Sequence, residues 1–145
     1  MNEQSSYEIN EATRFGGFWI RVLAYFIDTV ILVSVFLPGG IILLLSGFEP
    51  LAKVFYLVMA WIYFAVLQSS SWQASVGKKA VGLKVVDKNG DRISFGRATG
   101  RHFAKVISTL TIFIGYMMVG WTKRKEGLHD KIAGTLVIRI VKSRP

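Results

Sequence analysis

Cysteine is absent from this chain of 145 residues, so neither a disulfide nor a thiolate metal site can form. Histidine is nearly absent as well, with only His102 and His129. Two histidines without cysteine make no metal cluster, and we expect no metal site. The sequence also offers no combination of nucleophile, base and orienting acid. We therefore expect that the protein is not an enzyme and carries no cofactor.

Charge is missing from two long stretches. In 22–45 the only charged residue is Asp28, and 54–68 has none. The first stretch is long enough to cross a bilayer about 30 Å thick at about 1.5 Å per residue. Hydrophobic residues make up 52% of the chain and the mean hydropathy is +0.42. We predict two transmembrane helices in an antiparallel hairpin, at about 18–45 and 51–69.

The net charge of +9 has two interpretations. Nucleic-acid binding is one of them. The basic residues, however, stand at the edges of apolar runs, as they do in the cytoplasmic flanks of membrane proteins. We therefore expect no nucleic-acid partner, and a bilayer with anionic headgroups instead. The residues expected to contact lipid headgroups are Arg97, Arg101, Lys123, Arg124 and Lys125.

A third apolar segment, at about 103–122, is short for a span and has basic residues on both sides. Either it crosses the membrane and leaves one basic end outside, or it re-enters or lies at the surface. The positive-inside rule favours the second alternative and places the N-terminus in the cytoplasm. The polar leader 1–16 would then precede one membrane domain, 17–145.

The segment 74–101 is not membrane-like. Within it, "VGLKVVD" and "DRISF" flank Asn89-Gly90, which is a strong signal for a tight β-hairpin. The later "GTLVIRIV" has the same β-branched pattern. We predict a small cytoplasmic β element from about 81–95 together with 135–141, so the fold is a membrane protein, mainly α. The nearby "SVGKKAVG" lacks the first glycine of a phosphate loop and is interpreted as a turn with a basic face.

Asp28 is the most informative residue because a charge at bilayer depth costs on the order of 3 kcal/mol. It is either a structural partner of a cation or a ligand for an ion or a proton. Arg21 lies two turns earlier on the same face, but helical side chains lean toward the N-terminus, away from Asp28. Each needs a partner from elsewhere, and Lys105 and Asp130 have the required charges.

We predict that Asp130 pairs with Arg21 at the cytoplasmic edge of the membrane. His129 precedes Asp130, but adjacent helical residues point about 100° apart. It is therefore a candidate member of a charge network with Lys105, and no catalytic pair is expected.

Three blocks of the sequence, "RVLAYFID", "VGKKAVGLKVVDKNG" and "KRKEGLHDKIAGTLVI", resemble the RDD family over about residues 15–141. The family is named after one arginine and two aspartates, which correspond to Arg21, Asp28 and Asp130. The resemblance implies a small multi-pass protein of the bacterial inner (cytoplasmic) membrane. Members have been thought to transport unknown ligands, and some look like sodium/proton antiporters.

These observations lead to two hypotheses of function. In the first, the protein is a cation/proton exchanger in which Asp28 binds a monovalent cation or a proton, with Arg21 and Asp130 shaping the site. Three short elements scarcely enclose a path, so this hypothesis implies a homo-oligomer. In the alternative, the protein is a non-transport accessory or scaffold protein whose Arg and Asp charges serve assembly.

Overall fold

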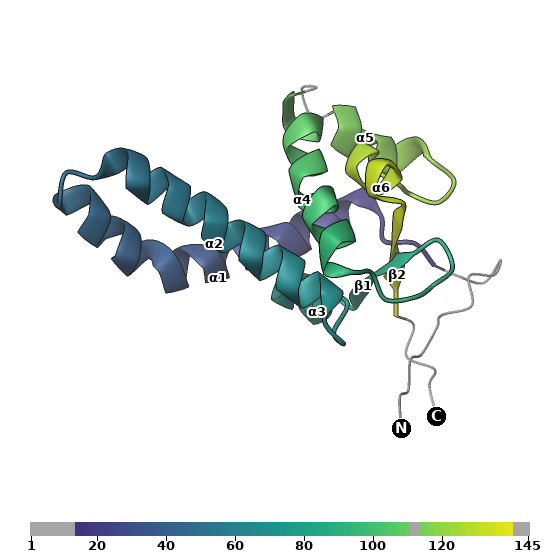
Figure 1. The fold of residues 1–145 in the computed structure, drawn as a ribbon. Helices are drawn as coiled ribbons and strands as arrows, with labels where there is room; N and C mark the ends of the chain where they lie inside the picture. The colour runs from purple at the N-terminus through teal and green to yellow at the C-terminus, as the bar shows by residue number, and fades with distance from the viewer. Residues whose placement is uncertain (1–13, 111–113, 141–145) are drawn as a thin grey trace.

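The computed structural model describes residues 14–110 and 114–140 (Figure 1). Helices α1 (Phe18–Leu45) and α2 (Glu49–Ser69) form an antiparallel hairpin that projects from the rest of the molecule. Both are long and apolar enough to cross a membrane, as the uncharged runs predict. Gly47 in the connecting turn has φ +78°, a backbone conformation that glycine adopts readily.

Small residues bring the two long helices close together near the tip of the hairpin. A Cβ atom on Gly40 would lie 2.2 Å from the hydroxyl oxygen of Tyr56 on α2. The Tyr56 hydroxyl donates a hydrogen bond to the carbonyl of Leu37, at 3.4 Å. Close packing of this kind stabilises helix pairs in lipid, where burial of apolar surface provides no driving force.

A two-stranded sheet lies at the base of the hairpin. Strand β1 (Leu83–Asp87) pairs antiparallel with β2 (Thr135–Arg139), with Val85 opposite Val137. Leu83, Val85 and Val137 belong to the same buried core as Ala24 of α1 and Ala65 of α2. The sheet is therefore packed directly against the base of the two long helices, as Figure 1 shows.

The prediction of a β-hairpin across Asn89-Gly90 is wrong for the segment after the turn. The turn is present, because Gly90 has φ +89° and the Asp87 amide donates to the Asp91 carbonyl at 2.9 Å. Residues 91–94, however, are not a strand, and helix α4 (Phe95–Leu110) begins directly after them. Ser94 starts this helix, since its hydroxyl accepts a hydrogen bond from the Arg97 amide at 3.2 Å. The partner of β1 is instead the segment "GTLVIRIV", which the sequence predicts to join it.

The third apolar segment is divided between α4 and α5 (Ile114–Trp121), which are bent by 104° relative to each other. After α5 the chain returns to the start of α1, where Nη2 of Arg21 donates to the Lys125 carbonyl at 2.6 Å. This contact favours the re-entrant alternative. Re-entry or surface lying of this segment stays a prediction.

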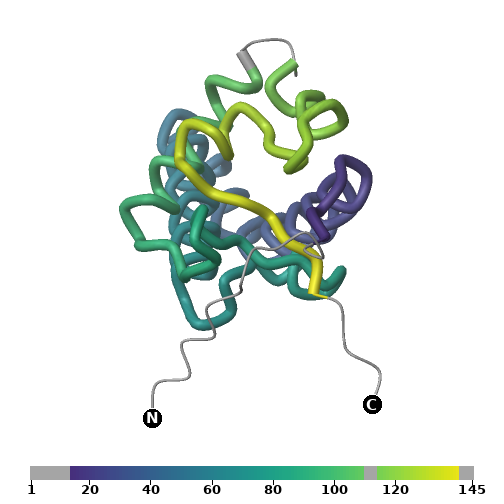
Figure 2. The backbone as a smooth tube through the Cα atoms, turned by 90° about the vertical axis from the view of Figure 1, so that its right-hand side faces the viewer, coloured from purple at the N-terminus to yellow at the C-terminus, as the bar shows by residue number. Residues whose placement is uncertain are grey.

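The short helices α3 (Val76–Ala80) and α6 (Leu128–Ala133) complete the base. Figure 2 looks onto this base, with the C-terminal segment (yellow) passing from α4 (green) to the start of α1 (purple). There Phe15 forms a β-bridge with Ile138, and the Gly16 amide donates to the Val137 carbonyl at 2.8 Å. The start of α1, β1 and β2 therefore lie at one end of the hairpin.

Candidate functional site

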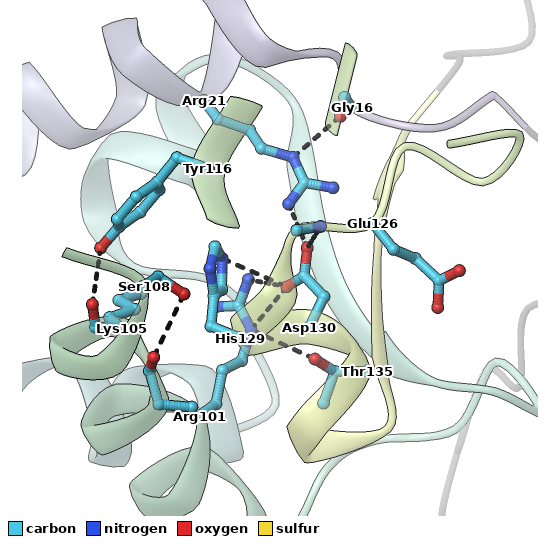
Figure 3. Close-up of polar contacts among 12 residues, drawn as sticks. Gly16, Arg21, Arg101, Lys105, Ser108, Tyr116, Glu126, His129, Asp130 and Thr135 are labelled. Carbon is cyan, nitrogen blue, oxygen red and sulfur yellow. Dashed lines mark hydrogen bonds and ion pairs between the residues drawn. The ribbon is translucent and has the colours of Figure 1, made fainter. Parts of the chain in front are cut away.

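Asp130 on α6 is completely buried and forms the centre of a charge network (Figure 3). Its Oδ2 accepts hydrogen bonds from Nη1 of Arg21 and from the Gly127 amide, the latter at 3.0 Å. Its Oδ1 accepts from Nε and Nη2 of Arg101, at 3.0 and 2.6 Å. Both oxygens of the carboxylate are thus occupied, and the predicted pairing of Arg21 with Asp130 is present.

Arg21 joins three segments of the chain. Besides its ion pair with Asp130, its Nε donates to the Gly16 carbonyl at 2.8 Å, and its Nη2 donates to the Lys125 carbonyl. These contacts hold the entry to α1 and the loop after α5 together at the start of the hairpin. The guanidinium suits this position because its donors point in fixed, divergent directions.

Arg101 corrects the sequence interpretation, which assigned it to lipid headgroups. Its side chain is only 2% exposed and lies inside the network. Nη1 donates to Oε1 of Gln68 at 2.9 Å, and Nε also donates to the hydroxyl of Thr135 at 3.2 Å. The position of Asp130 among Lys125, His129 and Lys131 is the signal that could have pointed to a buried cationic partner. Three basic residues recur every four positions on one face of the helix, so the sequence alone does not show which side chain points inward. They are Arg97, Arg101 and Lys105.

The other predicted headgroup residues lie at the surface. Arg97 is exposed, and its Nη1 lies 3.5 Å from Oδ2 of Asp87. Lys123, Arg124 and Lys125 are exposed in the loop after α5. Contact of these four residues with lipid stays a prediction.

Asp28 lies apart from the Asp130 network, although it too is buried, with 1% of its surface exposed. Its Oδ1 accepts hydrogen bonds from the Tyr63 hydroxyl and the Gly77 amide, both at 2.7 Å. Its Oδ2 accepts from the Ser75 hydroxyl at 2.6 Å. All three donors are neutral. Within the described residues, Asp28 makes no ion pair.

Gly77 allows α3 to reach Asp28. A Cβ atom at this position would lie 2.0 Å from the carbonyl oxygen of Ala24 on α1, so only glycine fits here. Ser75 caps α3, since its hydroxyl accepts from the Lys78 amide at 3.5 Å while donating to Asp28. The neutral donors around Asp28 carry no charge signal in the sequence and were not foreseen.

The electrostatics of α6 keep Asp130 charged and His129 neutral. Burial raises the pKa of Asp130, but the positive charges of Arg101 and Arg21 outweigh burial and hold this pKa well below its usual range. Burial lowers the pKa of His129 to about 2. The Nε2 atom of His129 lies 3.5 Å from Oδ1 of Asp130. It is therefore a neutral neighbour of the network, and its Nδ1 finds no hydrogen-bond partner among the described residues.

Lys105, the other candidate member of the network, makes no ion pair with Asp28 or Asp130. Its Nζ lies over the ring of Phe64, 4.5 Å from the centroid. Across residues 14–110 and 114–140, no group of three or more His, Asp or Glu side chains is arranged to hold a metal ion.

Comparison with known proteins places this geometry in a family. The sequence profile of the RDD family matches residues 15–134. The chain is 36% identical to the Bacillus subtilis uncharacterized protein YxaI, over 84% of this chain and 95% of that protein. It is 29% identical to the B. subtilis uncharacterized membrane protein YteJ, over 86% of this chain and 80% of that protein. It is also 29% identical to the Mycobacterium leprae proline-rich antigen, over 71% of this chain and 40% of that protein. No solved structure matches significantly. The chain belongs to the RDD family, and its two long apolar helices make it a membrane protein.

Proposed function

We propose that this protein transports a monovalent cation in exchange for protons, with Asp28 as the carboxylate that binds either one. The observation that carries the proposal is the set of partners around Asp28. The carboxylate is buried in an apolar helix, yet its three donors, from Tyr63, Ser75 and Gly77, are all neutral. A buried carboxylate that makes no ion pair within the described residues offers a position for a cation.

The atoms around Asp28 suit such a cation. Hard cations prefer oxygen ligands. The hydroxyl oxygen of Tyr63 lies 2.7 Å from Oδ1 of Asp28, and that of Ser75 lies 2.6 Å from Oδ2. Rotation of the two hydroxyl hydrogens away from the carboxylate would turn both oxygens into ligands. A proton on Asp28 would neutralise the carboxylate in place of the cation. Exchange requires a group that binds either the cation or the proton.

The path and the orientation belong to the same proposal. The base of the hairpin, where α1, α2 and α3 meet, is the expected cytoplasmic entrance, because the basic flanks gather there. One hairpin cannot enclose a path across the membrane, so we expect a homo-oligomer in the bacterial inner membrane. Asp28, which the chain's own α2 and α3 cover, would then be reached from the cytoplasmic entrance.

The second candidate is an accessory or scaffold protein whose charges serve assembly. It is favoured by the network around Asp130, where both carboxylate oxygens are occupied by the chain's own donors. Such a saturated network fixes the packing of helices and leaves no ligand position. The two candidates therefore assign different roles to the two aspartates.

Proteoliposomes with an imposed sodium or potassium gradient and an internal pH dye test the proposal. Wild-type protein should couple cation flux to proton flux. Asp28→Asn should lack this flux, and Ser75→Ala should need a higher cation concentration, since the carboxylate remains but an oxygen ligand is lost. Glu49→Gln, at the exposed start of α2, is the control and should behave as wild type.

Insertion and the melting temperature are measured for each variant, so that a loss of flux can be separated from misfolding. Normal flux from correctly inserted Asp28→Asn protein would rule out the ion-binding role. The absence of any coupled flux from the wild-type protein would leave the assembly role as the better account.

A further inference from the structure

Helix α4 has an apolar face that the described parts of the chain leave half uncovered. Four large apolar side chains on it are between 46% and 56% exposed. At about 100° per residue they lie within about a third of the helix circumference, and no charged residue shares this arc. The exposed Arg97 lies on another side of the helix, where its Nη1 is 3.5 Å from Oδ2 of Asp87 at the end of β1. The four apolar residues are Phe95, Phe103, Val106 and Ile107.

The contacts between α4 and α2 show that the two helices cross. The hydroxyl of Thr99 accepts a hydrogen bond from Nε1 of Trp61 at 3.1 Å, whereas Nη1 of Arg101 reaches Gln68, at 2.9 Å. Two residues further along α4, the ring of Phe103 is again beside Trp61, with 6.2 Å between centroids. In helices that run side by side, contacts advance in step along both of them, and these contacts do not. Figure 1 likewise shows α4 running across the direction of the hairpin.

The length of α2 places this crossing inside the bilayer. Trp61 stands twelve positions after Glu49, the first residue of α2 near the tip of the hairpin, which is about 18 Å along the helix axis. The hydrocarbon core of a bilayer is about 30 Å thick, so it extends past Trp61 toward the base by about 12 Å. The rest of α2, up to Ser69, supplies this length. A tilt of the hairpin would carry the membrane still further along α2.

We propose that α4 lies in the plane of the membrane, inside the leaflet next to the base of the hairpin, with its exposed apolar face against lipid acyl chains. A helix with one apolar face and a charge on another side suits this position. Arg97 would point toward the base and the headgroups, because its partner Asp87 belongs to the sheet at the base. Helix α4 then occupies one leaflet and does not cross the membrane.

Lipid is the expected occupant because this face continues the lipid-facing surface of α2. At the level of the crossing, Ile62 and Val66 of α2 are 39% and 47% exposed. The polar groups at the junction, the indole of Trp61 and the hydroxyl of Thr99, bond to each other. Hydrocarbon supplies no hydrogen-bond partner, so polar groups next to it need partners within the chain.

This proposal goes beyond the function proposed at Asp28 and does not depend on it. It concerns the outer face of α4, whereas Asp28 is buried between α1, α2 and α3. Immersion of α4 is therefore measured without any transport assay.

Single cysteines that carry a nitroxide spin label test the depth of α4, because the chain has no cysteine of its own. Full-length protein labelled at Phe103→Cys or Ile107→Cys is reconstituted into vesicles of phosphatidylethanolamine and phosphatidylglycerol. Collisions of the label are measured with oxygen, which concentrates in hydrocarbon, and with a water-soluble nickel chelate, which hydrocarbon excludes. Ile62→Cys on α2 is the lipid reference, and Asn89→Cys, in the exposed turn after β1, is the water reference.

Both labels on the apolar face should show a ratio of oxygen to chelate collisions close to that at Ile62→Cys. Arg97→Cys is the matched control, since it is exposed on the same helix but on another side, and its ratio should be shifted toward that at Asn89→Cys. Phe103 and Ile107 are half-exposed, so their replacement removes little packing, and if one variant does not insert, the other decides the question.

Two results would overturn the proposal. Ratios at Phe103→Cys and Ile107→Cys that match the water reference would place the apolar face outside the membrane. Labels at these positions that are shielded from both reagents, with spin–spin broadening between molecules, would mean that a second copy of the chain covers the face in place of lipid.

Discussion

The guanidinium of Arg101 and the carboxylate of Asp130 form an ion pair closed off from solvent, with 2.6 Å between Nη2 and Oδ1. The pair joins α4 to α6, two helices that pack against each other. Arg21 completes the arrangement from α1. The three elements that gather at the base of the hairpin are therefore held by one carboxylate, and its loss should affect all of them together.

Replacement of Arg101 should be far more damaging than replacement of Arg97, one turn earlier. Arg101→Met leaves Asp130 buried with one cationic partner removed, which costs about 3–5 kcal/mol in comparable sites. Arg97→Met breaks only an exposed contact, which contributes about 0–1 kcal/mol. Melting temperatures of the two variants in detergent provide the comparison. Equal melting temperatures would contradict a central role for Arg101.

Arg21→Met and Asp130→Asn should show strong coupling in a double-mutant cycle. Each single change removes the same ion pair, so the double variant should be less destabilised than the sum of the two single variants. The difference is expected to be about 0.5–3 kcal/mol, the range found for residues in one network. Additive effects would mean that Arg21 acts mainly through its bonds to the carbonyls of Gly16 and Lys125.

Gly77→Ala should displace α3 from α1. The added methyl group would meet the carbonyl oxygen of Ala24 at 2.0 Å, and a backbone atom cannot move aside without shifting the helix. The hydrogen bond from the Gly77 amide to Asp28 would be lost with it. Gly96→Ala on α4 is the control, since nothing lies within 4 Å of its Cβ position. It should be neutral or stabilising by up to about 1 kcal/mol. Thermal unfolding followed by tryptophan fluorescence separates the two variants.

His129 should make the protein less stable as the pH falls from about 6.5 to 4.5. In the folded state its pKa is about 2, whereas the ordinary value is 6.5. Between these values the unfolded chain binds a proton that the folded protein does not, so stability decreases by at most about 1.4 kcal/mol per pH unit. Asp130 contributes no slope in this window, because its lowered pKa matters only below the usual range of a carboxyl group.

Melting temperatures of the wild type and His129→Gln across this pH window isolate the effect. The wild-type curve should fall more steeply toward acid than the variant curve. Parallel curves would mean that the imidazole is charged or accessible in the folded protein.

Single cysteines should report the orientation directly, because the chain has none of its own. A membrane-impermeant maleimide should label Ser46→Cys, at the tip of the hairpin, in intact cells. Asn89→Cys and Lys123→Cys, at the base, should react only after permeabilisation. Labelling of Lys123→Cys from outside would mean that α4 and α5 together cross the membrane.

Charge and hydropathy were sufficient to predict the two long helices and the pairing of Arg21 with Asp130. An isolated charge in apolar or like-charged surroundings is stabilised by a partner of opposite sign. The sequence contains such a cation, Arg21, and such an anion, Asp130. The role of Arg101 was missed because regular spacing on a helix does not reveal which face turns inward. The donors to Asp28 were missed for a different reason. Hydroxyls and amides such as those of Ser75 and Gly77 are common and uncharged, and only the three-dimensional packing selects them.

The strand pairing was predicted in part for a related reason. Asn89-Gly90 has the local chemistry of a hairpin turn, and the turn forms. Tertiary packing decides the conformation after the turn, because Ile93 is buried in the core and Ser94 starts α4. A distant strand, β2, then takes the edge that a local hairpin would have used.

The separation of 109 residues between Arg21 and Asp130 has a consequence for biosynthesis. At about 5–20 residues per second, roughly 5–20 s pass between the synthesis of the arginine and that of its carboxylate. During this time the helical hairpin can enter the membrane while the Arg21 guanidinium at its base has no carboxylate partner. Arg101 also has no carboxylate partner until Asp130 is made. The native arrangement thus closes only after Asp130 has left the ribosome. A chain that stalls earlier displays unpaired arginines at the membrane edge, a chemical mark by which incomplete molecules differ from finished ones.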